Sequence, residues 1–209
     1  MVKIKKHKGP INDSLLESHE AVANTLNSYE LFYEKNKKII SIIFGFFIFF
    51  ISVFAIFNYY IFSQNKLAEN DMFQAVYYFE SDSLVKALNG DGNNYGFLEI
   101  IDQYSYTQAA NLSNYYAGVS YLKLGNFENA ISYLKSFDGN DKIIQARSYS
   151  LIGDAYIELE DYANGIKFLK KATNYYPNQF FTPNYLLKLA LVYEEMGDLK
   201  EAYQCYIKI

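Results

Sequence analysis

The chain has 209 residues, a formal net charge of −4 and a hydrophobic content of 51%. Its charges are divided unevenly, because residues 1–38 hold seven Lys against five Asp or Glu, whereas residues 63–209 hold twelve Lys or Arg against eighteen acidic residues. The acidic second part lacks the clustered cations that replace phosphate counterions, so we expect no nucleic-acid partner.

Residues 1–38 form a polar leader that contains one amphipathic segment. After Pro10, apolar residues recur at helical spacing, from Leu15 and Leu16 through Val22 and Leu26 to Phe32. This pattern predicts a helix that lies along a membrane or binds a partner, since an isolated helix of this length is only marginally stable in water.

The segment Ile39–Phe62 contains no charged residue, and seventeen of its twenty-four residues are Ile, Phe or Val. As a helix it would be roughly 36 Å long, which is enough to cross a hydrocarbon core of about 30 Å. We therefore predict a transmembrane helix over residues 39–62 that contacts membrane lipid. A core helix of a soluble protein would be expected to show a polar stripe, which this segment lacks.

The flanking charges predict the orientation of this helix. Lys35, Lys37 and Lys38 precede it, whereas Lys66 is the only early cation after it, so the N-terminus is expected in the cytoplasm. The competing interpretation is a cleaved secretory signal. It is disfavoured because the apolar run is long and no small-residue cleavage site follows Phe62.

Residues 63–110 are predicted to form a linker helix and a capping helix. The first helix is expected over Leu67–Leu88 and ends at the turn-forming sequence Asn89–Asn94, which contains two glycines. A second, short apolar helix is expected over Phe97–Tyr104, packed on the domain that follows.

The residue inventory after the predicted membrane helix limits the chemistry. Both histidines, His7 and His19, precede that helix, and Cys205 is the only cysteine of the chain, so histidine-based triads, histidine-containing zinc sites and internal disulfides are all excluded. A buried structural thiol is the simpler interpretation of Cys205. Paired carboxylates such as Glu194 and Glu195 suit a solvated helix face. We therefore predict no enzymatic activity and no cofactor or metal.

Three segments of the second part resemble one another. Tyr121–Ala130 is echoed by Tyr156–Gly165 and by Tyr193–Ala202, and each copy predicts a helix, a tight turn at Gly125, Glu160 or Gly197, and a second helix. Asn126, Asp161 and Asp198 are expected to cap the second helices.

These copies resemble the tetratricopeptide repeat. The middle copy matches the spacing of that family with a set of large, small and proline positions: Tyr149, Ile152, Gly153, Tyr156, Gly165, Leu169, Ala172 and Pro177. The resemblance covers residues 111–209, with the third repeat ending inside its second helix. It implies a right-handed solenoid whose last hairpin would be covered by further chain or by a partner. Together with the apolar run, this predicts an all-α fold in which a single N-terminal transmembrane helix precedes the tetratricopeptide-repeat solenoid.

The first helix of each repeat is expected to line a concave groove that is apolar and acidic and binds protein partners. Its predicted lining residues are Tyr115, Val119, Leu122, Arg147, Ser150, Asp154, Glu158, Leu187, Leu191 and Glu194. Because Asp154 and Glu158 lie there, clamping of a carboxylate by a basic groove is disfavoured.

The overall layout resembles the YfgM-type ancillary subunits of the bacterial Sec translocon. That resemblance implies a non-catalytic scaffold in the bacterial inner membrane, with the repeats in the periplasm. Its expected partners are Sec translocon subunits, a PpiD-like foldase and exported chains. The alternative is a structural component of another envelope assembly or secretion machine that uses the same repeats.

Overall fold

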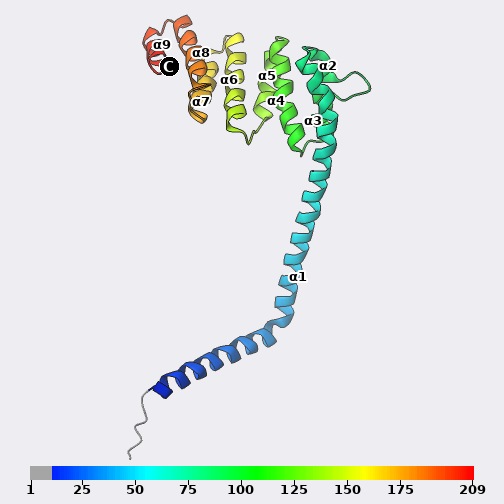
Figure 1. Ribbon diagram of the computed structural model, residues 1–209, viewed down its shortest axis with the longest axis vertical. Helices are drawn as coiled ribbons and strands as arrows, with labels where there is room; N and C mark the ends of the chain where they lie inside the picture. Colours follow the sequence, from blue (N-terminus) through cyan, green and yellow to red (C-terminus); the bar gives the residue numbers. More distant parts are fainter. Residues whose placement is uncertain (1–10) are drawn as a thin grey trace, which may run out of the picture. The chain divides into compact units, whose positions relative to one another are not determined.

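The computed structural model describes residues 11–209, and over that range it is helical, without a β-strand, which confirms the all-α prediction (Figure 1). Residues 1–10 of the predicted cytoplasmic leader lie outside the described residues, as do the side chains of Leu15 and Leu16. The helices are α1 Ile11–Glu80, α2 Leu84–Asn89, α3 Phe97–Gln103, α4 Gln108–Lys123, α5 Phe127–Ser136, α6 Lys142–Glu158, α7 Tyr162–Tyr175, α8 Thr182–Glu195 and α9 Leu199–Tyr206.

The chain divides into two compact units, residues 1–58 and residues 59–209. The described part of the first unit consists of α1 residues, and most of the apolar side chains described there are exposed. The stretch of α1 from Tyr29 to Glu80 contains a segment long and apolar enough to span a membrane, and none of that segment is buried. A core helix of a soluble domain would be buried, so the structure gives that interpretation no support.

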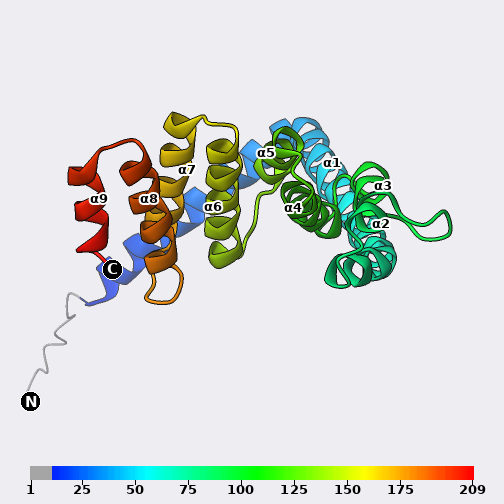
Figure 2. The same ribbon diagram turned by 90° about the horizontal axis from the view of Figure 1, so that it is seen from above.

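The second unit consists of helical hairpins that follow one another in chain order (Figure 2). The pairs α4–α5, α6–α7 and α8–α9 coincide with the three predicted repeats. Each pair is joined by the same turn, in which the N–H of Asn126, Asp161 or Asp198 donates to the carbonyl of Tyr121, Tyr156 or Tyr193 at 2.8–2.9 Å.

The turns contain a residue in the left-handed region at the predicted position. Gly125 and Gly197 have φ of 75° and 77°, and Glu160 takes φ of 59° at the equivalent site of the middle repeat. The predicted caps are confirmed, since the side chains of Asn126, Asp161 and Asp198 each accept a backbone N–H from the first turn of the following helix.

A fourth hairpin precedes these three and was not predicted. At the end of α1, the N–H of Ser83 donates to the carbonyl of Tyr78 at 2.8 Å, and Asp82 has φ of 57°, as at the later turns. Ala75 and Ala87 are fully buried at the small-residue positions of this hairpin. The predicted single helix over Leu67–Leu88 is therefore wrong, because this turn separates α1 from α2.

The second helix of this first hairpin is interrupted by a loop between α2 and α3. Asp91 organises the loop, since its carboxylate accepts the N–H of Asn93 at 2.9 Å, the N–H of Asn94 at 2.8 Å and the hydroxyl of Tyr78 at 2.6 Å. These hydrogen bonds, the one from Tyr78 foremost, hold the pKa of Asp91 well below its usual range. The α3 helix then packs on α4, as predicted for the capping helix.

Aromatic side chains join the first hairpin to the second. The Tyr116 ring stacks on Phe97 at a centroid distance of 5.2 Å and meets the edge of Phe79 at 5.1 Å. The hydroxyl of Tyr104 donates to Asp71 of α1 at 2.6 Å, and this bond raises the pKa of Tyr104 to about 12. The end of α1 is thus part of the repeat core and not a linker beside it.

Gly153 marks the closest approach of α6 and α7, and its replacement by leucine is expected to destabilise the second unit. A Cβ atom at Gly153 would lie 2.9 Å from Cγ of Leu169 and 3.2 Å from the carbonyl of Gly165. We expect Gly153→Leu to cost about 1–3 kcal/mol through overpacking. That cost lowers the melting temperature of the full chain in detergent by roughly 2–4 °C per kcal/mol, measured by circular dichroism.

The matched control is Ala163→Leu, which adds the same side chain at an exposed position of α7. It should leave the melting temperature unchanged. Equal melting temperatures for Gly153→Leu and the wild type would show that α6 and α7 do not pack through Gly153.

Candidate protein-binding groove

One face of α4 and one face of α6 line two neighbouring pockets of the second unit. On α4 this face carries Tyr115, Val119 and Leu122, and on α6 it carries Arg147, Asp154 and Glu158. Consecutive members of each set are three, four or seven positions apart, so they lie in a row on each helix. We call the surface that contains the two pockets the groove.

The first pocket, here the aromatic pocket, has a volume of about 340 Å³. Tyr115 is buried in it and packs on Phe137 at a ring distance of 5.4 Å, while Phe181, from the segment before α8, stays 38% exposed. Its lining residues are Phe79, Glu80, Tyr115, Tyr116, Val119, Ile143, Ile144, Arg147 and Phe181. The pocket therefore combines an aromatic wall with two charged side chains.

Arg147 is exposed in the aromatic pocket and makes no ion pair or hydrogen bond with any residue that the structure describes. Burial raises the pKa of Tyr115 and of Tyr185, and the positive charge of Arg147 opposes both shifts. The hydroxyl of Tyr185 is buried and has no hydrogen-bond partner within the described part of the chain. Both tyrosine hydroxyls therefore stay protonated beside the cation.

The second pocket, here the charged pocket, has a volume of about 580 Å³ and lies at the other end of α6. In it, Nζ of Lys188 lies 2.6 Å from a carboxylate oxygen of Asp154 and 3.3 Å from the hydroxyl of Ser150. Its lining residues are Leu122, Lys123, Gly125, Phe127, Asp154, Ile157, Glu158 and Lys188. Burial raises the pKa of Asp154, and the charge of Lys188 opposes that rise.

The structure distributes the predicted groove residues over four settings: the aromatic pocket, the charged pocket, the core and the exposed surface of α8. Tyr115, Val119 and Arg147 line the aromatic pocket, and Leu122, Asp154 and Glu158 line the charged pocket. Ser150 is only 1% exposed, so it supports Lys188 from within the core and offers no surface to a partner. In the third repeat Leu187, Leu191 and Glu194 are exposed on α8.

Sequence reasoning missed Lys188, which changes the charge of the groove. The groove was predicted to be acidic, but Asp154 is paired with Lys188, which leaves Glu158 as the unpaired acid of the charged pocket among the described residues. The equivalent positions of the earlier repeats are Tyr116 and Leu151, so the repeat pattern predicts a core residue there. Lys188 also lies 34 residues after Asp154 in the sequence, so no short sequence pattern predicts that the two side chains pair.

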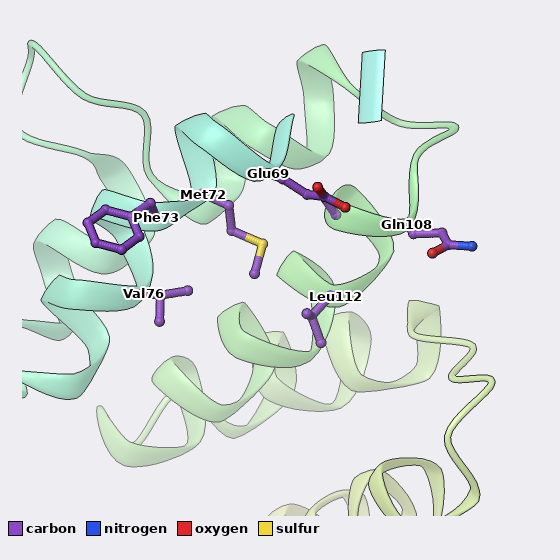
Figure 3. Close-up of a pocket in the computed structure, with 7 residues that line it drawn as sticks. Glu69, Met72, Phe73, Val76, Gln108 and Leu112 are labelled. Atoms are coloured by element: carbon purple, nitrogen blue, oxygen red, sulfur yellow. The ribbon is translucent and has the colours of Figure 1, made fainter. Parts of the chain in front are cut away.

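A third pocket, lined by α1 and α4, was also missed. Its volume is about 350 Å³, and Figure 3 shows Met72 in its middle with Val76 and Leu112 on either side. Glu69 and Gln108 provide the polar part of its lining. The pocket exists because the end of α1 is a repeat helix, which the sequence analysis treated as a linker.

The described residues give little support for metal binding or for a reactive cysteine. They contain no group of three or more His, Cys, Asp or Glu side chains that could hold a metal ion. Cys205 is buried and unpaired, and burial raises the pKa of its thiol, which disfavours the reactive thiolate. A structural thiol was the predicted role.

Comparison with known proteins supports the repeat assignment. One family model of the tetratricopeptide repeat matches residues 146–179 and 183–209, and a second model of the same repeat matches residues 113–138. The matches fall on α4–α5, α6–α7 and α8–α9, so the chain contains tetratricopeptide repeats, a class of module that binds other proteins. The comparison with curated proteins found no match.

Two solved structures share this fold. They are a MamA RS-1 ArsTM double mutant and a MamA fragment, 41-end, from Desulfovibrio magneticus RS-1. Each is 20% identical to this chain, with 68% of this chain and 72% of the MamA chain covered and a TM-score of 0.57. At this identity the likeness concerns the fold alone.

Removal of Lys188 is expected to destabilise the protein in a pH-dependent way. Because burial raises the pKa of Asp154 above that of the unfolded chain, ionisation of Asp154 opposes folding at neutral pH, and Lys188 reduces that penalty. Lys188→Met should therefore cost about 1 kcal/mol near neutral pH. The loss should shrink as the pH falls to about 4, close to the ordinary pKa of an aspartate, because the raised pKa leaves more of the Asp154 carboxyl group protonated there.

Thermal unfolding of the full chain at both pH values checks this expectation. The double variant Asp154→Asn/Lys188→Met is the control, because it removes the charge that Lys188 neutralises. Its stability difference from the single variant Asp154→Asn should not depend on pH in this range, because neither protein has a carboxyl group at position 154. A loss in Lys188→Met that is the same at both pH values would contradict an ionised Asp154.

Proposed function

We propose that this chain is a membrane-anchored, non-catalytic scaffold whose repeats bind protein segments in the groove. The proposal rests on two properties of α1. Its apolar run Ile39–Phe62 is exposed, and the same helix continues to Glu80 as the first helix of the repeat stack. An exposed apolar surface of this size needs a nonpolar environment, and a lipid bilayer provides one of matching length.

The orientation follows from the flanking charges, and it separates the two parts of the chain. Lys35, Lys37 and Lys38 favour a cytoplasmic N-terminus, which puts the repeats on the outer side of the bacterial inner membrane. At the other end of the run, Tyr59 and Tyr60 suit the membrane interface, and the ammonium of Lys66 lies 4.8 Å from the centroid of the Phe62 ring.

Within this setting the proposed partners are Sec translocon subunits, a PpiD-like foldase and exported chains. The support is the resemblance in layout to YfgM-type subunits, together with a groove that mixes apolar and charged residues without a catalytic constellation in the described part of the chain. Such a groove holds a segment of another protein by side-chain complementarity.

The proposed topology predicts which part of the chain a protease reaches. In spheroplasts, protease added from outside should degrade residues 63–209 and leave a fragment of about forty to sixty N-terminal residues that is shielded by the membrane. An epitope tag at either end identifies the fragment by immunoblot. Protection of the repeats would contradict the orientation, and loss of the N-terminal segment from the mature protein would indicate a cleaved signal.

Recovery of Sec components with the full chain from mild detergent tests the partner. We expect it to fall when Ile39–Phe62 is replaced by an unrelated span, and again in Leu187→Ser/Leu191→Ser/Glu194→Ser, which changes exposed residues of α8 that were predicted to line the groove. The control Glu128→Ser/Lys167→Ser changes exposed side chains of the outer helices α5 and α7 and should leave recovery unchanged. If neither change lowers recovery, the translocon proposal fails and another envelope assembly takes its place.

A further inference from the structure

Two unpaired charges of opposite sign lie on one face of α6. Arg147 and Glu158 are both exposed, and neither forms an ion pair or hydrogen bond with the residues that the structure describes. They are eleven positions apart, which corresponds to three turns and a separation of about 16 Å along the helix. The groove therefore has a positive and a negative end.

Unlike Arg147 and Glu158, the other charged residues of the charged pocket form ion pairs. Lys188 is paired with Asp154, and Lys123 lies 2.8 Å from Asp82, so these four charges largely cancel at the negative end. Glu80 of α1 also lines the aromatic pocket, but it is not within ion-pair distance of Arg147. Glu80 weakens the positive end without neutralising it through a direct contact.

The positive end coincides with the aromatic pocket. A large apolar side chain entering that pocket would contact Phe79, Tyr116 and Phe181, and a carboxylate on the neighbouring residue would lie close to the Arg147 guanidinium. Guanidinium groups bind carboxylates through paired hydrogen bonds, and Arg147 has all its donors available. The opposite end offers the carboxylate of Glu158 to a cation.

We propose that the groove binds a dipolar protein segment, in which a carboxylate beside a large apolar residue pairs with Arg147 and a lysine or arginine pairs with Glu158. This inference rests on the proposed function and specifies the chemistry of its partner. In this proposal the segment is extended, so that one side chain can enter the aromatic pocket while the following residues reach the Glu158 end of the groove. At about 3.3 Å per residue the two charged residues of the segment are then about five positions apart.

A labelled peptide and the full chain in nanodiscs test the proposal by fluorescence anisotropy. The probe has aspartate next to phenylalanine, with a lysine about five positions after the aspartate. A swapped probe of identical composition exchanges the aspartate and the lysine, so that its phenylalanine would bring the lysine to Arg147. We expect the first probe to bind on the order of ten-fold more tightly than the swapped probe, with a difference that shrinks between about 0.05 M and about 0.5 M salt.

Charge exchange in the protein should reverse this preference. Arg147→Glu/Glu158→Arg alters only exposed side chains, so we expect it to fold normally and to prefer the swapped probe on the order of ten-fold. Glu80→Gln should strengthen binding of the first probe, because it removes the negative charge beside the positive end. The matched control Lys167→Glu/Glu128→Arg exchanges two exposed charges on the outer helices α7 and α5 and should leave both affinities unchanged.

Several outcomes would overturn the proposal. They are equal affinity for both probes, a preference that charge exchange does not reverse, or tighter binding of a helical probe whose two charges are eleven positions apart. Failure here is separable from failure of the proposed function. If the α8 substitutions still lower recovery of Sec components while both probes bind equally, the proposed scaffold function stands. Only the proposal that the groove prefers a dipolar segment then fails.

Discussion

The close approach of the two helices within each hairpin is the constraint on which the repeat stack depends. Each turn needs one residue in the left-handed region, and each pair of helices needs small residues where the backbones meet. Gly118 and Gly153 meet Leu134 and Leu169 at distances that leave no room for a further methyl group. Because this contact sets the distance between the helices, it also determines which faces of α4 and α6 remain open as the groove.

These local requirements explain what the sequence could and could not predict. Three hairpins were found because their turn, cap and small residues recur at nearly constant spacing. The first hairpin was missed because the loop after Asn89 lengthens the spacing from Tyr78 to Tyr121. The first helix of this hairpin is also the end of α1 and is continuous with the apolar run. The sequence analysis therefore interpreted it as a linker. The prediction failed where an insertion hid the period.

The charges of the groove were less predictable than its shape. The positions that line it follow from helical periodicity, which is a local property of the chain. The pairing of Asp154 with Lys188 joins α6 to α8, and the charge left on Glu158 depends on that pairing. A charge count along the sequence therefore predicts an acidic groove, whereas the folded chain has a groove with two oppositely charged ends. Specific pairing, and not net charge, determines what such a surface attracts.

The continuity of α1 bears on how binding and anchoring are related. Phe62 and Glu69 are seven positions apart, so the pocket lined by α1 and α4 begins about 10 Å along the helix from the end of the apolar run. In the proposed membrane-anchored arrangement, this pocket lies near the membrane along the chain. A partner that is itself anchored in the membrane would then meet the proposed scaffold at a high effective concentration, so modest contacts in the groove would suffice to hold it. Under that proposal a groove with exposed charges and shallow pockets is adequate, although the same surface in a freely diffusing protein would bind weakly.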